Sequence, residues 1–177
     1  MNLYAKLQQR AATGKPVRVA LIGAGKFGSM YLAQVPRTPG VHLAAIADLS
    51  PAAARTNLAR VGWKDGQADA KSMDEAIASG RTWLTEDWRA VVTNPQIDVV
   101  VECTGNPIAA VDHCLLAFEH GKHVVNVTVE ADAFCGPLLA RKAQEAGVVY
   151  SMAFGDQPAL ICDLVDWART CGFPVVA

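Results

Sequence analysis

The stretch RVALIGAGKFGSM, Arg18 to Met30, decides the fold of this chain. Residues 17–22 are apolar apart from Arg18 and show no alternation with polar residues. Such a run is typical of a strand that is buried on both faces of a parallel sheet. Three glycines follow in the spacing G-x-G-x-x-G, and they are Gly23, Gly25 and Gly28. Residues 26–35 then have the pattern of a helix, so the stretch predicts a strand, a tight turn and a helix.

The order of the three glycines has a physical explanation if the turn receives a pyrophosphate. Gly23 allows the tight turn out of the strand, Gly25 lets the pyrophosphate approach bare backbone, and Gly28 lets the helix pack close to the sheet. The N–H groups at the start of the helix, aided by its dipole, then bind the phosphates. Lys26 and Phe27 complete the motif and are predicted to lie at the cofactor. Glycine-rich turns are common, so the motif alone is a weak signal.

Asp48 strengthens this prediction, because it stands 20 residues after Gly28 at the end of a second apolar strand, residues 41–47. An acidic residue at this place accepts hydrogen bonds from the adenosine ribose. The alternative is a turn residue ahead of Ser50-Pro51, which is a typical helix start. The carboxylate favours NAD because it repels a 2′-phosphate, whereas Arg55 on the next helix, with Lys26 close by, favours NADP. We therefore predict NAD(P)H as the cofactor and leave both forms open.

Strands and helices alternate along the whole chain. After a helix at residues 2–12, strands are expected at 17–22, 41–47, 82–85, 97–103, 123–129, 148–154 and, at its start, 174–177. Helices are expected at 26–35, 51–61, 86–93, 107–120, 133–146 and 159–170, with a helical turn at 74–78. This pattern predicts an α/β fold, a Rossmann doubly wound and mostly parallel sheet. We divide the chain into an N-terminal arm or helix, 1–14, and an NAD(P)-binding Rossmann domain, 15–177, and expect an N-terminal cofactor domain of a longer enzyme.

Later strand ends supply further candidates for the cofactor site. Thr104 and Gly105 follow the strand at 97–103, where the backbone is expected to border the cofactor crevice. Asn126 lies late in the strand at 123–129, and a structural role is as well supported as contact with the nicotinamide. Cys103 has no base nearby in the sequence and is interpreted as a buried structural thiol. Asp156 is interpreted as a helix N-cap, with a place beside the nicotinamide as the alternative.

The composition excludes several classes of protein. Hydrophobic residues make up 51% of the 177 residues and charged residues 19%, with a formal net charge of -1. This is a globular composition that gives no reason to expect nucleic acid or a membrane as partner. The sequence shows neither a bilayer-spanning run nor a signal peptide, so a cytoplasmic protein is expected. The five cysteines form no CxxC pair and the four histidines no metal motif, which predicts buried or partly buried free thiols and no metal site.

Several segments together resemble the N-terminal half of the homoserine-dehydrogenase-like oxidoreductases. They are GAGKFGSM (23–30), ADLSP (47–51), VVECTGNP (100–107), GKHVVNVT (121–128) and FGDQPALICDLVDWAR (154–169). More narrowly, the chain is similar to the deoxyxylulose-phosphate-reductoisomerase-like proteins, which often carry a SAF-type C-terminal region. The resemblance covers nearly all of the chain, and the later segments make it specific, because many Rossmann proteins share the first one.

The resemblance implies an NAD(P)-dependent oxidoreductase. The narrower group implies reductive isomerisation of 1-deoxy-D-xylulose 5-phosphate, a step of isoprenoid biosynthesis, with a divalent metal in the full-length enzyme only. Gly23, Gly25, Gly28 and Asp48 match the family's dinucleotide fingerprint, and Thr104 and Gly105 match its fourth-strand turn. Related sugar oxidoreductases carry a catalytic lysine after the fifth strand, but here that place reads NVTVEAD, 126–132. Catalytic residues therefore stay unknown.

Other functions remain open at this level. A homoserine-dehydrogenase-type or other NAD(P)-dependent dehydrogenase is the alternative within the enzymes. A non-catalytic module that senses NAD(H), or a Rossmann domain that binds a phosphosugar or coenzyme A, is the alternative outside them. We expect this chain to bind its cofactor, to form a homo-oligomer, and to be inactive without substrate residues that lie beyond it.

Overall fold

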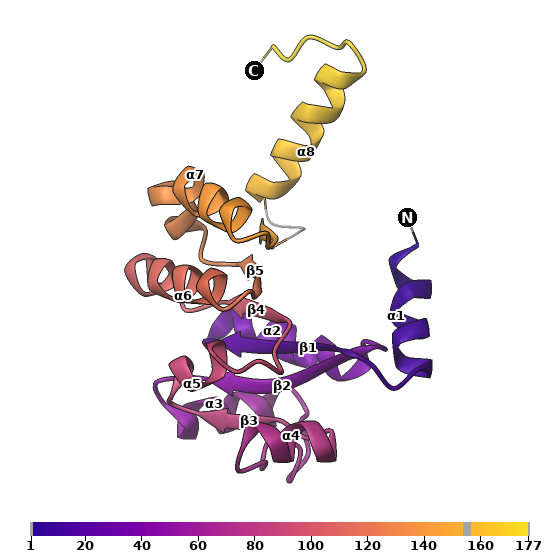
Figure 1. Ribbon diagram of the computed structural model, residues 1–177, viewed down its shortest axis with the longest axis vertical. Coiled ribbons are helices and arrows are strands. Elements are labelled where there is room, and N and C mark those ends of the chain that lie inside the picture. The colour runs from indigo at the N-terminus through magenta and orange to yellow at the C-terminus, as the bar shows by residue number, and fades with distance from the viewer. Residues whose placement is uncertain (1, 154–156, 177) are drawn as a thin grey trace.

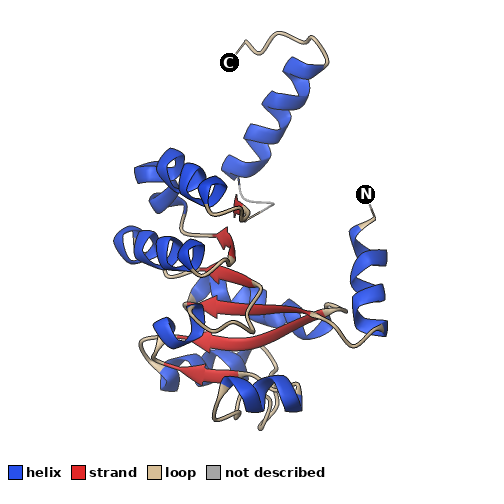
Figure 2. Ribbon diagram, viewed as in Figure 1, coloured by secondary structure: helices blue, strands red, loops and turns tan. Residues whose placement is uncertain are grey.

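The computed structural model describes residues 2–153 and 157–176 and shows an α/β fold (Figures 1 and 2). Six strands form one sheet in the order β3-β2-β1-β4-β5-β6, and every neighbouring pair is parallel. The strands are β1 (Val17–Ile22), β2 (Val41–Ala47), β3 (Trp83–Thr85), β4 (Val99–Glu102), β5 (His123–Asn126) and β6 (Tyr150–Met152). The strand order reverses between β1 and β4, so the doubly wound prediction is confirmed and the sheet is wholly rather than mostly parallel.

Helices cover both faces of this sheet. The helices of the described residues are α1 (Leu3–Ala12), α2 (Lys26–Gln34), α3 (Pro51–Arg60), α4 (Met73–Ser79), α5 (Trp88–Val92), α6 (Pro107–Glu119), α7 (Val129–Glu145) and α8 (Gln157–Thr170), with a short 3₁₀ turn η1 (Val35–Arg37). Of these, α2–α7 cover the sheet. Alternate residues of β1 enter two separate cores: Ala20 and Ile22 pack with α4–α7, while Val19 and Leu21 pack with α2 and α3. Burial on both faces explains the unbroken apolar run of β1.

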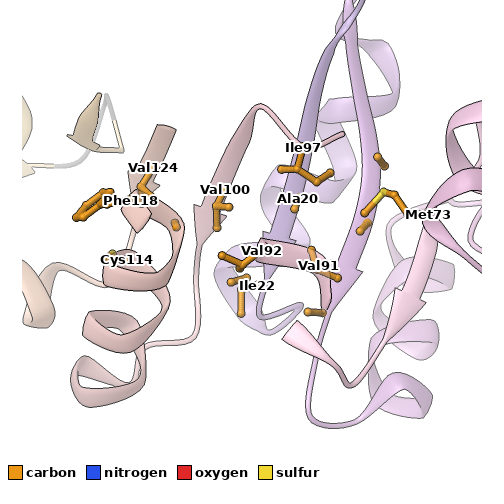
Figure 3. Packing of buried hydrophobic residues seen from close by; sticks show 14 of the residues in the cluster. Ala20, Ile22, Met73, Val91, Val92, Ile97, Val100, Cys114, Phe118 and Val124 are labelled. Atoms are coloured by element: carbon orange, nitrogen blue, oxygen red, sulfur yellow. The ribbon is translucent and has the colours of Figure 1, made fainter. Parts of the chain in front are cut away.

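The core on the α4–α7 side is continuous across four strands, β2, β1, β4 and β5. Figure 3 shows Val92 of α5 beside Ile22 of β1, and Phe118 of α6 beside Val124 of β5. All four side chains are at most 4% exposed. This packing fixes α5 and α6 against the sheet and so fixes the loops that precede them at its carboxyl edge.

Two expected strands differ from the structure. The strand at 123–129 ends at Asn126, because the Asn126 side chain accepts the N–H of Thr128 at 3.1 Å and turns the chain into α7. That helix starts earlier than expected and has a non-helical residue at Cys135, ahead of Pro137. Residues 174–176 form no strand, since Pro174 lacks an N–H to donate and Val176 is exposed, and no strand of the described residues pairs with them.

The two terminal helices contribute little to the core. The predicted N-terminal helix is present as α1, capped by Asn2, with no buried residue. Helix α8 extends away from the sheet in Figure 1 and exposes Leu160, Ile161, Leu164 and Trp167. Cys162 and Cys171 lie exposed on this terminal part of the chain, which corrects the expectation that all the thiols are buried or partly buried. Within 2–153 and 157–176, no helix combines the length and apolar character needed to cross a bilayer.

Candidate functional site

The carboxyl ends of β1, β2 and β4 enclose a pocket of about 430 Å³. Its lining includes Gly25, Asp48, Leu49, Trp88, Thr104 and His113. These residues come from the glycine turn, the end of β2, α5, the loop after β4 and the middle of α6. The pocket therefore lies where the strand order reverses, which is where ligands bind in open α/β sheets. A second hollow, beside Trp63 and Arg81, lies near the amino end of β2, where this rule places no ligand.

The glycine turn has the steric properties that its spacing predicts. Gly23 has a φ of 91° and a side chain there would approach the Cys103 carbonyl oxygen to 2.8 Å. A side chain on Gly28 would overlap the carbonyl oxygen of Gly23. A side chain on Gly25 would meet nothing within 4 Å, so this backbone is open to a ligand. Gly25 is also the N-cap of α2, which leaves the first N–H groups of this helix without a side-chain partner.

Asp48 joins the two turns that frame the pocket. One carboxylate oxygen, Oδ2, accepts the N–H of Ala24 at 2.8 Å, and Oδ1 accepts the N–H of Ser50 at 2.8 Å. The turn interpretation of Asp48 is therefore correct as far as the protein's own contacts go. Each carboxylate oxygen can accept more than one hydrogen bond, and Asp48 is only half-buried, so it can still bind a ribose.

The two basic candidates are placed differently. The Arg55 guanidinium donates to Asp69 Oδ1 at 2.6 Å, so it is held by a carboxylate other than Asp48. The hydrogen bond from Arg55 lowers the pKa of Asp69, which keeps that carboxylate charged. Lys26 lies exposed with Phe27 at the first turn of α2, directly after Gly25. Cofactor contact by Arg55, Lys26 and Phe27 stays a prediction.

The loop between β4 and α6 forms the opposite wall of the pocket. Thr104 is exposed, Gly105 has a φ of 69°, and the N–H of Gly105 donates to Thr128 Oγ1 at 3.0 Å. The side chain of Asn106 caps α6. Burial, and then the nearby Glu102 carboxylate, raise the pKa of Cys103, so its thiol stays protonated and the structural interpretation of Cys103 fits.

Asn126 uses its whole amide within the protein. It is fully buried and donates through Nδ2 to the Thr128 carbonyl oxygen at 3.1 Å and to the Tyr150 hydroxyl at 3.0 Å. These contacts support its structural interpretation, and Asn126 does not line the pocket. Direct contact with the cofactor stays a prediction. Asp156 lies outside the described residues.

Two residues of this region are not predicted from the sequence as site residues. Glu102 ends β4 with no exposed surface, and its Oε1 lies 3.2 Å from Nδ1 of His113 on α6. His113 is 5% exposed, packs edge-on against Trp88 at 4.3 Å between ring centroids, and lines the pocket. A single acidic residue at the end of an apolar strand is the only signal for Glu102, and nothing in the helix pattern marks His113. Among 2–153 and 157–176, no three His, Cys, Asp or Glu side chains cluster as metal ligands.

Known proteins match this chain in sequence and in structure. The model of a family described as "Homoserine dehydrogenase, NAD binding domain" matches residues 23–152. A homoserine dehydrogenase of Pseudomonas aeruginosa is 32% identical over 135 residues, which are 76% of this chain and 28% of that enzyme. Sequence similarity therefore covers the glycine turn, Asp48 and the β4–α6 loop.

Solved structures agree with this match. A homoserine dehydrogenase from Thiobacillus denitrificans superposes with a TM-score of 0.56 at 26% identity and covers 78% of this chain and 29% of the enzyme. An NAD-binding oxidoreductase from Klebsiella pneumoniae has a TM-score of 0.60 at 23% identity, over 89% of this chain and 39% of its own, which shows the shared fold. The chain spans 28% of the length of the curated relative and 39% of the first structure.

Proposed function

Because the chain belongs to the family of homoserine dehydrogenase NAD-binding domains, we propose that its carboxyl-edge pocket holds the nicotinamide dinucleotide of an oxidoreductase. The observation that carries the proposal is the open backbone at Gly25, which lies at the uncapped N-terminus of α2 and lines the same pocket as Asp48. An N–H-lined helix start attracts a pyrophosphate, and a carboxylate beside it accepts the ribose hydroxyls.

From the lining residues we infer a place for each part of the cofactor. With its ribose on Asp48, the adenine would lie against Leu49, which is 92% exposed, and towards Trp88. The pyrophosphate would lie over Gly25. The nicotinamide would then extend past the strand-order reversal to β4 and β5, beside Thr104 and Gly105.

We infer a preference for NAD(H) over NADP(H). The Asp48 carboxylate would repel a 2′-phosphate at the ribose that it binds. Arg55, the residue that argued for NADP, is paired with Asp69 at 2.6 Å. In this arrangement Arg55 is not free to receive a 2′-phosphate, so the preference for NAD(H) rests on Asp48.

For the reaction, we favour a homoserine-dehydrogenase type of hydride transfer over reductive isomerisation of deoxyxylulose phosphate. The family and the enzyme from Pseudomonas aeruginosa both carry the former name. The reductoisomerase interpretation, with its metal and its place in isoprenoid biosynthesis, rests on the sequence resemblance alone. When bound, the cofactor would accept the hydride as NAD⁺ or supply it as NADH, and the chain would bind and orient the cofactor.

A turnover assay tests whether this chain acts as an enzyme. We expect this chain to bind NADH but to oxidise no homoserine with NAD⁺ and to reduce no deoxyxylulose phosphate with NADPH and a divalent metal. The segment 126–132 carries no lysine at the place where related sugar oxidoreductases have their catalytic lysine. Measurable turnover of either substrate would contradict the expected inactivity and identify the reaction at once.

Binding itself is tested by energy transfer from tryptophan to NADH. Trp88 lines the pocket, so bound NADH should quench its emission and emit in turn. Replacement of Trp88 by Phe should remove most of this transfer, whereas replacement of Trp63, beside the other hollow, should leave more of it. Failure of NADH to bind would overturn the proposed function.

We also propose that the chain self-associates. The exposed apolar side chains of α8, which include Leu164 and Trp167, form a surface that is unfavourable in water. Light scattering should give a mass above that of the monomer, and Leu164→Glu with Trp167→Glu should lower it. A clean monomer of the unmodified chain would refute this proposal.

A further inference from the structure

Glu102 is a carboxylate at a place where a carboxylate is costly. It is the last residue of β4, pairs in register with Ile22 of β1 and Asn126 of β5, and has 0% of its surface exposed. Burial of a charged group is unfavourable unless hydrogen bonds compensate it. An apolar residue would complete the strand pattern of β4 at no such cost, so the contacts of Glu102 indicate what the carboxylate does.

Those contacts connect the two loops that follow β4 and β5. Oε1 of Glu102 accepts the Thr104 hydroxyl at 2.5 Å and the Thr104 N–H at 3.3 Å, and it lies next to His113 Nδ1. Oε2 accepts a short hydrogen bond from the Thr128 hydroxyl. One buried carboxylate therefore holds the β4–α6 loop, the β5–α7 loop and helix α6 at the same point.

Thr128 shows that this arrangement takes precedence over local helix stability. Thr128 is the N-cap residue of α7, where a threonine hydroxyl usually accepts an N–H of the first turn. Here the hydroxyl caps nothing in α7. It donates to Glu102 and accepts the N–H of Gly105 at 3.0 Å, so the backbone of the pocket loop is fixed by a residue of the next loop.

We infer that Glu102 and Thr128 are positioning residues, which hold the Thr104–Gly105 turn in the conformation that receives the nicotinamide half of the cofactor. The inference rests on the proposed function. Neither side chain needs to touch the cofactor, because each acts through the backbone of residues 104 and 105. The same bonds link the turn to the segment 126–132, where the nicotinamide is expected to lie.

The test compares three threonine variants of the full chain. Thr128→Val keeps the shape of the side chain and removes the hydroxyl, and Thr128→Ser restores a hydroxyl without the methyl. The matched control is Thr82→Val, because Thr82 is equally buried and its hydroxyl donates to the Leu43 carbonyl oxygen at 2.6 Å, just before β3 at the amino edge. Thr82→Val loses one buried hydrogen bond and Thr128→Val loses two, so Thr128→Val should be the less stable variant. Urea unfolding of both variants measures this difference, so that a loss of stability is told apart from a loss of positioning.

Two measurements separate positioning from stability. In Thr128→Val, amide hydrogen exchange at Gly105 should be at least about tenfold faster and the Kd for NADH about tenfold weaker, with both restored by Thr128→Ser. Thr82→Val should change neither by more than about twofold. The inference is overturned if exchange at Gly105 is unchanged in Thr128→Val, if Thr128→Ser restores nothing, or if Thr82→Val weakens NADH equally. Exchange at Gly105 needs no cofactor, so it tests the inference even if the chain fails to bind NADH.

Discussion

Asp48 and Glu102 are two carboxylates that end the strands on either side of β1, and they do different work. Asp48 follows β2, is half-buried, and lines the pocket while it accepts the N–H groups of Ala24 and Ser50. Glu102 ends β4, has no exposed surface, and accepts only from groups of the protein. Each holds a turn of the crevice in place, but only Asp48 is accessible to a ligand.

One carboxylate of the crevice is therefore available to bind a ligand, and the other only holds the surrounding loops in place. A carboxylate with free lone pairs at the surface can exchange water for a ribose hydroxyl at small cost. A carboxylate with no access to water stabilises the protein only while all its donors stay in place. Replacement of Asp48 should therefore mainly weaken cofactor binding, and replacement of Glu102 should mainly lower the free energy of unfolding.

The largest expected effect is on folding, in Glu102→Ala. Removal of the carboxylate leaves the Thr104 and Thr128 hydroxyls without their acceptor and opens a cavity, which should lower the free energy of unfolding by about 3 kcal/mol. Asp48→Ala should lower it by only about 1 kcal/mol. Urea unfolding followed by circular dichroism measures both. Equal losses would remove the distinction between the two carboxylates.

The glycine turn provides the second comparison. Gly28→Ala should destabilise the chain by about 2 kcal/mol, because its methyl group would overlap the carbonyl oxygen of Gly23. Gly25→Val should keep the circular dichroism spectrum of the unmodified chain and bind NADH at least about tenfold more weakly, since it fills the open space where the pyrophosphate is expected. If Gly25→Val bound NADH normally, the proposed place of the pyrophosphate would be wrong.

The third prediction concerns affinity alone. Asp48→Ala should weaken NADH about tenfold, which is about 1.4 kcal/mol, because a charged acceptor for the ribose is lost. NADPH should lose less, since the same change removes a charge that repels its 2′-phosphate. Titration of both cofactors into both proteins gives the four values of Kd. Equal losses would mean that Asp48 is only a turn residue.

The smallest effect is expected at Arg55. Its guanidinium is paired with Asp69 and both side chains are about half exposed, so the ion pair contributes little to stability. Arg55→Ala should change the Kd of NADH by less than about twofold. Asp69→Ala should release Arg55 and lower the Kd of NADPH by about twofold. A large loss of NADPH affinity in Arg55→Ala would return Arg55 to the cofactor site.

The sequence predicts the Asp48 side of the crevice better than the Glu102 side. Gly23, Gly25, Gly28 and Asp48 have the spacing of the dinucleotide-binding motif, with the acidic residue 20 residues after the last glycine. This spacing reveals Asp48 although its contact with Ala24 spans 24 residues. Glu102, His113 and Thr128 meet only because β4, β5 and α6 pack together. Their partners lie 11 and 26 residues away, and no periodicity marks such contacts.

Some predicted boundaries of strands are wrong for a related reason. The β5 strand ends early because the Asn126 side chain accepts the N–H of Thr128, which competes with the ladder that the apolar pattern predicts. The expected strand from Pro174 onward has suitable residues but no neighbouring strand, and β propensity without a partner does not make a strand. Both bounds of helix α3 lie within one residue of the expected range 51–61, because its start is fixed locally by the N-cap Ser50 and by Pro51.

The most direct test of the proposed site is a map of backbone amide chemical shifts on addition of NADH. The largest shifts should lie at residues 23–28, at Leu49 and Ser50, and at Thr104 and Gly105, which frame one pocket at the carboxyl edge. Residues around Trp63 and Arg81, near the amino end of β2, should not respond. Shifts confined to that second hollow, or none at residues 23–28, would contradict the account.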